Sequence, residues 1–148
     1  MIKQFLDFFK HSSENPDNVE HTLELATAAL LFEVARADDQ IDNREQSAIR
    51  DMLQSQFSLS AEELDALTET GKSNAKEAVD LIQFTRVLKE QYSSEQRTAL
   101  MTRLWQVAFI DNDLNKYEES TIRQIADLLY VPHSVFIKTK LNVKAQQE

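Results

Sequence analysis

Residues 31–50 read LFEVARADDQIDNREQSAIR, and residues 104–123 read LWQVAFIDNDLNKYEESTIR. The two stretches are offset by 73 residues and share 8 of their 20 positions. The identical pairs are Leu31 and Leu104, Val34 and Val107, Ala35 and Ala108, Asp38 and Asp111, Glu45 and Glu118, Ser47 and Ser120, Ile49 and Ile122, and Arg50 and Arg123. This self-similarity predicts two copies of one helix–turn–helix unit, over about residues 20–57 and 94–130.

The apolar matches fall at helical spacing and are candidate core positions. Two similar hairpins could pack about a pseudo-two-fold axis, so that each would bury the apolar face of the other. Phe32 is matched by Trp105, which we therefore expect to be a core aromatic residue and not a ligand-stacking one.

The composition selects helices in the rest of the chain as well. Among 148 residues there are one glycine and two prolines, whereas β-sandwiches and nucleotide-binding α/β folds need glycine at turns and phosphate loops. We predict a single all-α domain over residues 1–148, a compact bundle of about eight helices. The expected helices span about residues 2–10, 19–37, 43–57, 60–71, 77–90, 94–110, 116–130 and 132–142.

Local sequence signals mark several helix ends. Ser60 with Glu63 and Ser93 with Gln96 have the spacing of capping boxes, in which each side chain bonds the backbone N–H of the other residue. Gly71 is placed to close the fourth helix in a left-handed conformation. Pro132 suits the first position of the last helix.

Charge and cysteine content limit the classes of partner and compartment. The net charge is −9 and cysteine is absent, so we expect a cytoplasmic protein without disulfides or thiolate metal sites. Residues 1–70 carry −10 and residues 71–148 carry +1. The acidic half opposes nucleic-acid binding and suits cations or basic partners, unless it is simply a solvated surface. No apolar run approaches the length that spans a membrane.

The polar matches of the repeat concentrate at its two turns. Glu45 and Glu118 would lie in the first turn of a helix, where the helix dipole stabilises an acid. Asp38 and Asp111 would end the preceding helices, where the dipole disfavours negative charge. Two alternatives remain open for these aspartates: each accepts N–H bonds in an Asx-turn, or each binds a cation.

The cation alternative assigns oxygen ligands to both turns. The run from Asp38 to Glu45 is spaced like the second half of an EF-hand loop, but the first ligand positions of such a loop would fall on Val34 and Arg36, which excludes a true EF-hand. What remains is a weak site for a divalent cation such as calcium or magnesium. Its tentative ligands are Asp38, Asp42, Glu45, Asp111 and Glu118.

The same residues resemble the TerB-like family, which is associated with tellurite resistance and is related to a domain of a membrane-anchored DnaJ-type co-chaperone. The resemblance rests on the run from Val34 to Asp38 with Glu45, on its counterpart from Val107 to Glu118, and on residues 122–129. Asp39 and Asn112 replace the turn glycine of the family, and both residue types tolerate left-handed conformations. The resemblance implies an all-helical fold and a bacterial stress-related setting, without a settled biochemical activity.

Catalytic motifs are missing from the sequence. His11, His21 and His133 are scattered, and there is no nucleophile elbow or phosphate-binding glycine loop. We therefore expect a non-enzymatic stress-response or regulatory protein that binds an unidentified protein partner, with a divalent cation at its acidic turns. The alternatives are a structural adaptor without metal, or a peripheral membrane protein that uses the apolar residues of its first helix. Packing of that helix onto the domain is favoured over membrane contact. The sequence leaves the oligomeric state open.

Overall fold

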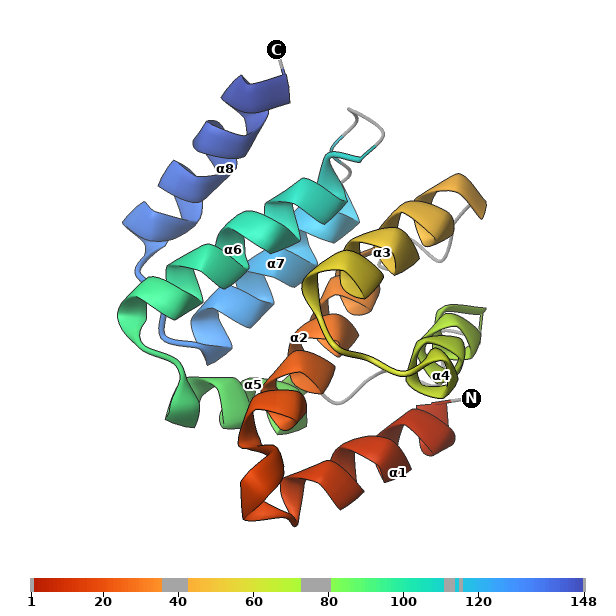
Figure 1. Ribbon diagram of the computed structural model, residues 1–148. Helices are drawn as coiled ribbons and strands as arrows, with labels where there is room; N and C mark the ends of the chain where they lie inside the picture. Colours follow the sequence, from red (N-terminus) through yellow and green to blue (C-terminus); the bar gives the residue numbers. More distant parts are fainter. Residues whose placement is uncertain (1, 36–42, 73–80, 111–113, 115, 148) are drawn as a thin grey trace.

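The computed structural model describes residues 2–35, 43–72, 81–110, 114 and 116–147, and for residues 2–6, 16, 43–46, 68–72 and 147 it describes the backbone only. Within this part of the chain every element is helical, which confirms the predicted all-α bundle. The elements are α1 (Ile2–Ser13), the 3-10 turn η1 (Pro16–Asn18), α2 (Val19–Ala35), α3 (Asn43–Gln56), α4 (Ala61–Lys72), α5 (Leu81–Gln91), α6 (Ser94–Ala108), α7 (Lys116–Leu128) and α8 (His133–Gln147) (Figure 1).

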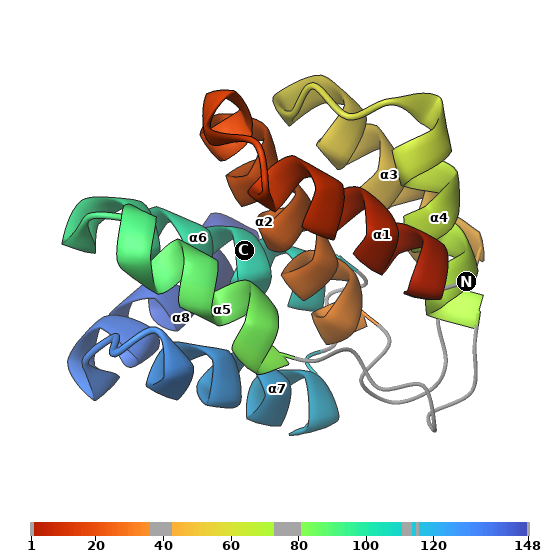
Figure 2. The same ribbon diagram turned by 90° about the horizontal axis from the view of Figure 1, so that it is seen from below.

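The second helix forms the centre of the bundle. Every residue of α2 from Leu25 to Ala35 is buried except Glu33, which is half-buried. A helix that is apolar on all sides is typical of a core element, and α2 contacts α1, α3, α4, α5, α6 and α7. These six helices therefore surround α2, whereas α8 packs on the outside of α6 and α7 (Figures 1 and 2).

The buried apolar side chains belong to one cluster that extends from α1 to α8. Phe9 of α1 is 3% exposed, and its ring meets that of Phe84 edge-on at a centroid distance of 4.9 Å. Trp105 is fully buried, as the sequence predicted, and packs against Phe136 of α8. Within the described residues, no helix is long and apolar enough to cross a membrane.

The helix ends follow the spacing of the sequence repeat. α2 ends at Ala35 and α6 at Ala108, while α3 begins at Asn43 and α7 begins at Lys116. The apolar matches are buried in both copies, from Leu31 and Leu104 to Ile49 and Ile122. The pseudo-two-fold packing of the two units stays a prediction.

The predicted capping boxes are both present. At the start of α4, Ser60 Oγ accepts from Glu63 N at 3.1 Å and Glu63 Oε1 accepts from Ser60 N at 2.9 Å. Ser93 and Gln96 make the equivalent pair at the start of α6. These local signals place the helix starts correctly because each needs only four consecutive residues.

The predicted ends of α1, α4 and α8 are wrong, and α6 and α7 each end two residues before the predicted position. α1 continues to Ser13, and the buried pair between the Ser12 and Thr22 hydroxyls, at 2.6 Å, holds its end against α2. Gly71 does not close α4 in a left-handed conformation: α4 runs on to Lys72, and no described glycine has a positive φ. α8 continues to Gln147, past the predicted residue 142, because Thr139 and Val143 keep one side of the helix buried.

Candidate functional site

The first acidic turn joins α2 to α3. Asp38 and Asp42, two of the predicted ligands, lie between these helices but outside the described residues, as does Asp39. Glu45 belongs to the first turn of α3, as the sequence predicted, and its side chain is likewise outside the described part. The helix ends therefore bring this acidic stretch to the junction of α2 and α3.

The second acidic turn joins α6 to α7. Phe109 and Ile110 close α6 through backbone bonds to Trp105 O and Val107 O. Asp111 then lies outside the described residues. Glu118 lies in the first turn of α7 and is only 9% exposed. A buried carboxylate at a helix N-terminus gains from the helix dipole, so its position has a sufficient structural cause without a metal.

Of the predicted metal ligands, Glu118 is the one whose side chain lies in the described part of the chain. No group of three or more histidine, aspartate or glutamate side chains in the described part of the chain could hold a metal ion. Metal binding at the two acidic turns thus stays a prediction from the sequence. The structure gives only the helix ends on either side of them.

A second acidic feature, which the sequence analysis missed, centres on His21 of α2. Its Nε2 atom lies 2.7 Å from Glu63 Oε2 of α4, and its Nδ1 atom lies 3.8 Å from Glu24 Oε1. Glu63 is 7% exposed and holds the start of α4 through its other oxygen. The imidazole therefore links α2 to α4 through Nε2, whereas Nδ1 lies beyond hydrogen-bond distance of Glu24.

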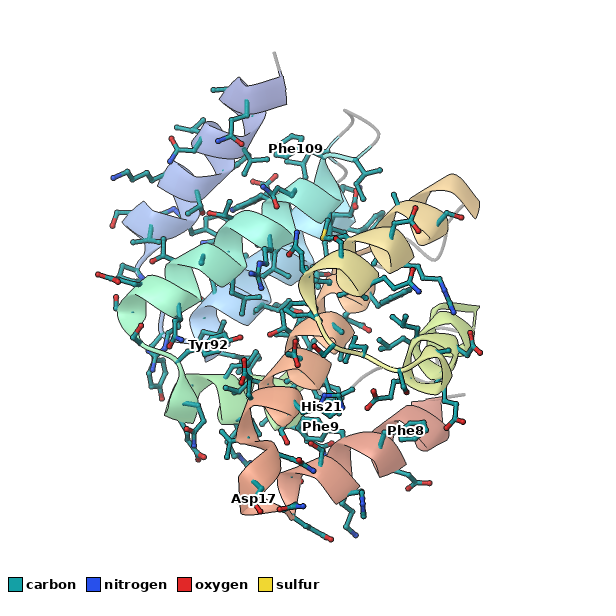
Figure 3. All side chains as sticks on the ribbon, in the orientation of Figure 1. Phe8, Phe9, Asp17, His21, Tyr92 and Phe109 are labelled. Carbon is teal, nitrogen blue, oxygen red and sulfur yellow. The ribbon has the colours of Figure 1, made fainter. Side chains whose placement is uncertain are left out.

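Beside this tie lies an open hollow of about 300 Å³. Its lining residues are Asp17, Asn18, Glu20, His21, Glu24 and Ser58. Glu24 Oε2 accepts from Ser58 N at 3.1 Å, which fixes one wall of the hollow. Figure 3 shows Asp17 at the edge of the molecule near the junction of α1 and α2, and His21 further from that edge. The hollow suits a positively charged group.

The other two histidines lie away from this feature. His11 is exposed on α1, and the exposed His133 stacks on Phe136 with the ring centroids 5.5 Å apart. The three histidines are therefore separate, as their scatter along the sequence suggested. Only the pairing of His21 was missed, because its partner Glu63 is 42 residues away in the sequence.

α8 covers the side of α6 that carries Trp105. The Trp105 Nε1–H group donates to Thr139 Oγ1 at 3.1 Å, and Lys140 Nζ donates to Glu119 Oε1 of α7 at 2.8 Å. The opposite side of α8 carries Ile137 and Leu141, which are 37% and 56% exposed. Among the described helices, α8 is the one that carries two exposed large apolar side chains.

The structure is thus an all-helical bundle with a central apolar helix, in which two acidic segments of the sequence each connect a pair of helices. The chain belongs to the TerB family: the family model described as "Tellurite resistance protein TerB" matches residues 24–141. The match begins within α2, ends within α8 and includes both acidic turns. Comparisons with curated proteins and with solved structures gave no match. The resemblance inferred from the sequence is confirmed, and the chain is a tellurite-resistance-associated domain.

Proposed function

We propose that this TerB-family chain is a non-enzymatic regulatory or stress-response protein that acts by binding a partner protein, and that its acidic turns bind a divalent cation such as calcium or magnesium. The observation that carries the proposal is the equivalence of the two helix junctions. At each junction an acidic stretch follows a helix that ends in a buried Val-Ala pair, and a glutamate lies in the first turn of the next helix.

The proposed ligands are Asp38, Asp42 and Glu45 at the first turn, and Asp111 and Glu118 at the second. Carboxylate oxygens are the ligands that calcium and magnesium prefer. Asp38 and Asp111 each follow a helix end by three residues, and because the helix dipole disfavours negative charge at that end, a bound cation would offset the repulsion. The first turn has more carboxylates, so it is expected to bind more tightly.

The histidines favour binding over catalysis. His21 Nε2 is engaged by the carboxylate of Glu63, and His11 and His133 lie on other helices. General acid–base catalysis needs such a group held beside the reacting atoms, and the sequence has no nucleophile elbow or phosphate-binding glycine loop. The proposal also places the protein in the cytoplasm, where a chain without cysteine needs no oxidising compartment.

A membrane role for α1 is the less favoured alternative. Phe9 is buried against Phe84, so insertion of the apolar face of α1 into a lipid surface would require that this core contact be broken. Burial of an aromatic side chain stabilises the fold by about 2–3 kcal/mol. A shallow contact with a membrane surface would have to supply at least this free energy.

The proposal is tested by affinity capture with the full chain as bait, from a lysate of the cells that produce it. One arm contains a chelator and the other contains millimolar calcium, magnesium or manganese. We expect a partner protein that is retained by the wild type with cation and is lost with chelator or with the Asp38→Asn, Asp111→Asn double variant. An Asp51→Asn variant, changed at an exposed acid of α3, is the matched control. If a partner is captured equally with and without cation and by the double variant, the alternative of an adaptor without metal is favoured. If no specific partner is captured, the interaction role is refuted.

A further inference from the structure

The outer face of α8 is separate from the surface that holds this helix on the bundle. Phe136, Thr139 and Val143 are 2–4% exposed and face α6, whereas Ile137 and Leu141 are exposed one helical turn apart. Residues four apart lie on the same face of a helix, and Lys144 continues that row. α8 is therefore apolar on two sides, and the described residues cover only one of them.

The other exposed large apolar side chains in the described part of the chain are isolated. They are Val19 of α2, Ile82 of α5, Tyr117 of α7 and Tyr130 in the turn before α8. Single exposed apolar residues are normal on soluble proteins. Two of them on consecutive turns of one helix are the feature that calls for an explanation.

Charge sets this face apart as well. Residues 133–147 carry three lysines and no acid, in a chain of net charge −9. Lys140 is used within the molecule, since it bonds Glu119. Lys138 and Lys144 are exposed, and the structure gives them no ion pair among the described residues. The apolar row is thus flanked by two cations that the acidic body of the protein does not neutralise.

We propose that this face, defined by Ile137, Lys138, Leu141 and Lys144 and here called the α8 face, docks an acidic amphipathic helix of a partner protein. The inference rests on the proposed function and names the chemistry of the partner. An apolar stripe of the partner would pack on Ile137 and Leu141, because side chains three or four apart form ridges that fit between those of a second helix. Carboxylates beside that stripe would pair with Lys138 and Lys144 and so set the specificity.

Two other occupants fit the α8 face less well. Two apolar side chains offer little area for insertion into lipid. A second copy docking through the same face would set lysines against lysines, and like charges across an interface are unfavourable. An acidic amphipathic helix can both pack on the apolar row and pair its carboxylates with the two lysines.

The test uses two synthetic amphipathic peptides of about 20 residues with the same leucine positions. Their remaining positions are mainly glutamate in one peptide and mainly lysine in the other. Binding of each labelled peptide to the full-length protein is measured by fluorescence anisotropy. We expect the glutamate peptide to bind the wild type, and the lysine peptide to bind at least about tenfold more weakly. Leu141→Ser should weaken the binding of the glutamate peptide by about tenfold or more.

Charge reversal makes the test sharper. The Lys138→Glu, Lys144→Glu variant should no longer bind the glutamate peptide and should bind the lysine peptide instead. The matched controls are Ile82→Ser, which removes an exposed apolar residue on α5, and Lys10→Glu with Arg86→Glu, which changes the net charge equally at other exposed sites. The controls should bind as the wild type does. Trp105 emission and the urea midpoint verify that every variant is folded.

Three results would overturn the proposal. The first is no binding of the glutamate peptide to the wild type. The second is binding that is unchanged by Leu141→Ser and by the charge reversal. The third is sedimentation with phosphatidylserine vesicles that the charge reversal abolishes while neither peptide binds, which would assign the α8 face to a membrane. If the captured partner of the previous experiment is retained by Leu141→Ser, the proposed function stands and the α8 face is not its docking surface.

Discussion

At the scale of single residues, Arg97 of α6 joins the ends of two other helices. Its guanidinium donates to Leu129 O, just after α7, at 3.1 Å, and to Lys89 O in the last turn of α5. The last carbonyl groups of a helix lack partners within the helix. One planar group with fixed N–H directions therefore completes two helix ends at once.

Arg97→Lys should lower the free energy of unfolding by about 1–3 kcal/mol, because an ammonium group cannot reach both carbonyl groups in the arginine geometry. Urea unfolding followed by Trp105 fluorescence measures the change. Arg123→Lys, at an exposed arginine of α7, is the control and should stay within about 0.5 kcal/mol of the wild type. If both variants are equally stable, the two carbonyl bonds contribute nothing.

Tyr130, just after α7, has an unusual backbone conformation that affects the stability of this helix end. Its φ of 58° lies in the left-handed region, which glycine adopts most readily at the end of a helix. Tyr130 N donates to Asp127 O and Val131 N to Ala126 O, the two bonds of a Schellman motif. The ring is 73% exposed, with Lys89 Nζ at 4.5 Å from its centroid.

Tyr130→Gly should be more stable than Tyr130→Ala by about 1 kcal/mol, because both variants lose the ring and only glycine relieves the left-handed strain. This order is the reverse of that in a helix interior, where alanine is the more stable. Thermal and urea unfolding of the two variants test it directly. Alanine equal to or better than glycine at this position would mean that the positive φ carries no cost.

At the scale of elements, Glu63 links the start of α4 to α2. It has the same capping role in α4 that Gln96 has in α6, but it also contacts His21. The capping boxes were predictable because four neighbouring residues define them. The His21 contact was not, because packing alone brings together residues 42 apart in the sequence.

Glu63→Ala should therefore cost about 1 kcal/mol or more beyond Gln96→Ala, since each loses a capping bond and only the first loses the contact to α2. The comparison is made by urea unfolding. In a His21→Ala background the two costs should become similar. A difference that persists without His21 would show that the tie between α2 and α4 is not its cause.

At the scale of the whole molecule, the family, the helical fold and most of the core followed from one repeated stretch of sequence. Leu31, Leu104 and Trp105 were expected in the core and are fully buried. The full length of α8 was not foreseen, because its buried side has only the sparse row Phe136, Thr139 and Val143 and its periodicity is obscured by the exposed Ile137 and Leu141. The acidic hollow beside His21 was also not foreseen, because its walls come from η1, from α2 and from the link before α4.

The central claim, a divalent cation at the acidic turns, is tested most directly by thermal unfolding of the metal-stripped protein, followed by the fluorescence of the buried Trp105. The scan is repeated with millimolar calcium, magnesium or manganese. A cation at 100 times its dissociation constant adds about 2.7 kcal/mol, which raises the unfolding temperature by about 5–10 °C for a domain of this size. We predict such a rise for at least one cation, and its loss in the Asp38→Asn, Asp111→Asn variant but not in Asp51→Asn. No rise with any of the three cations would contradict the claim and leave both aspartates as turn-forming residues.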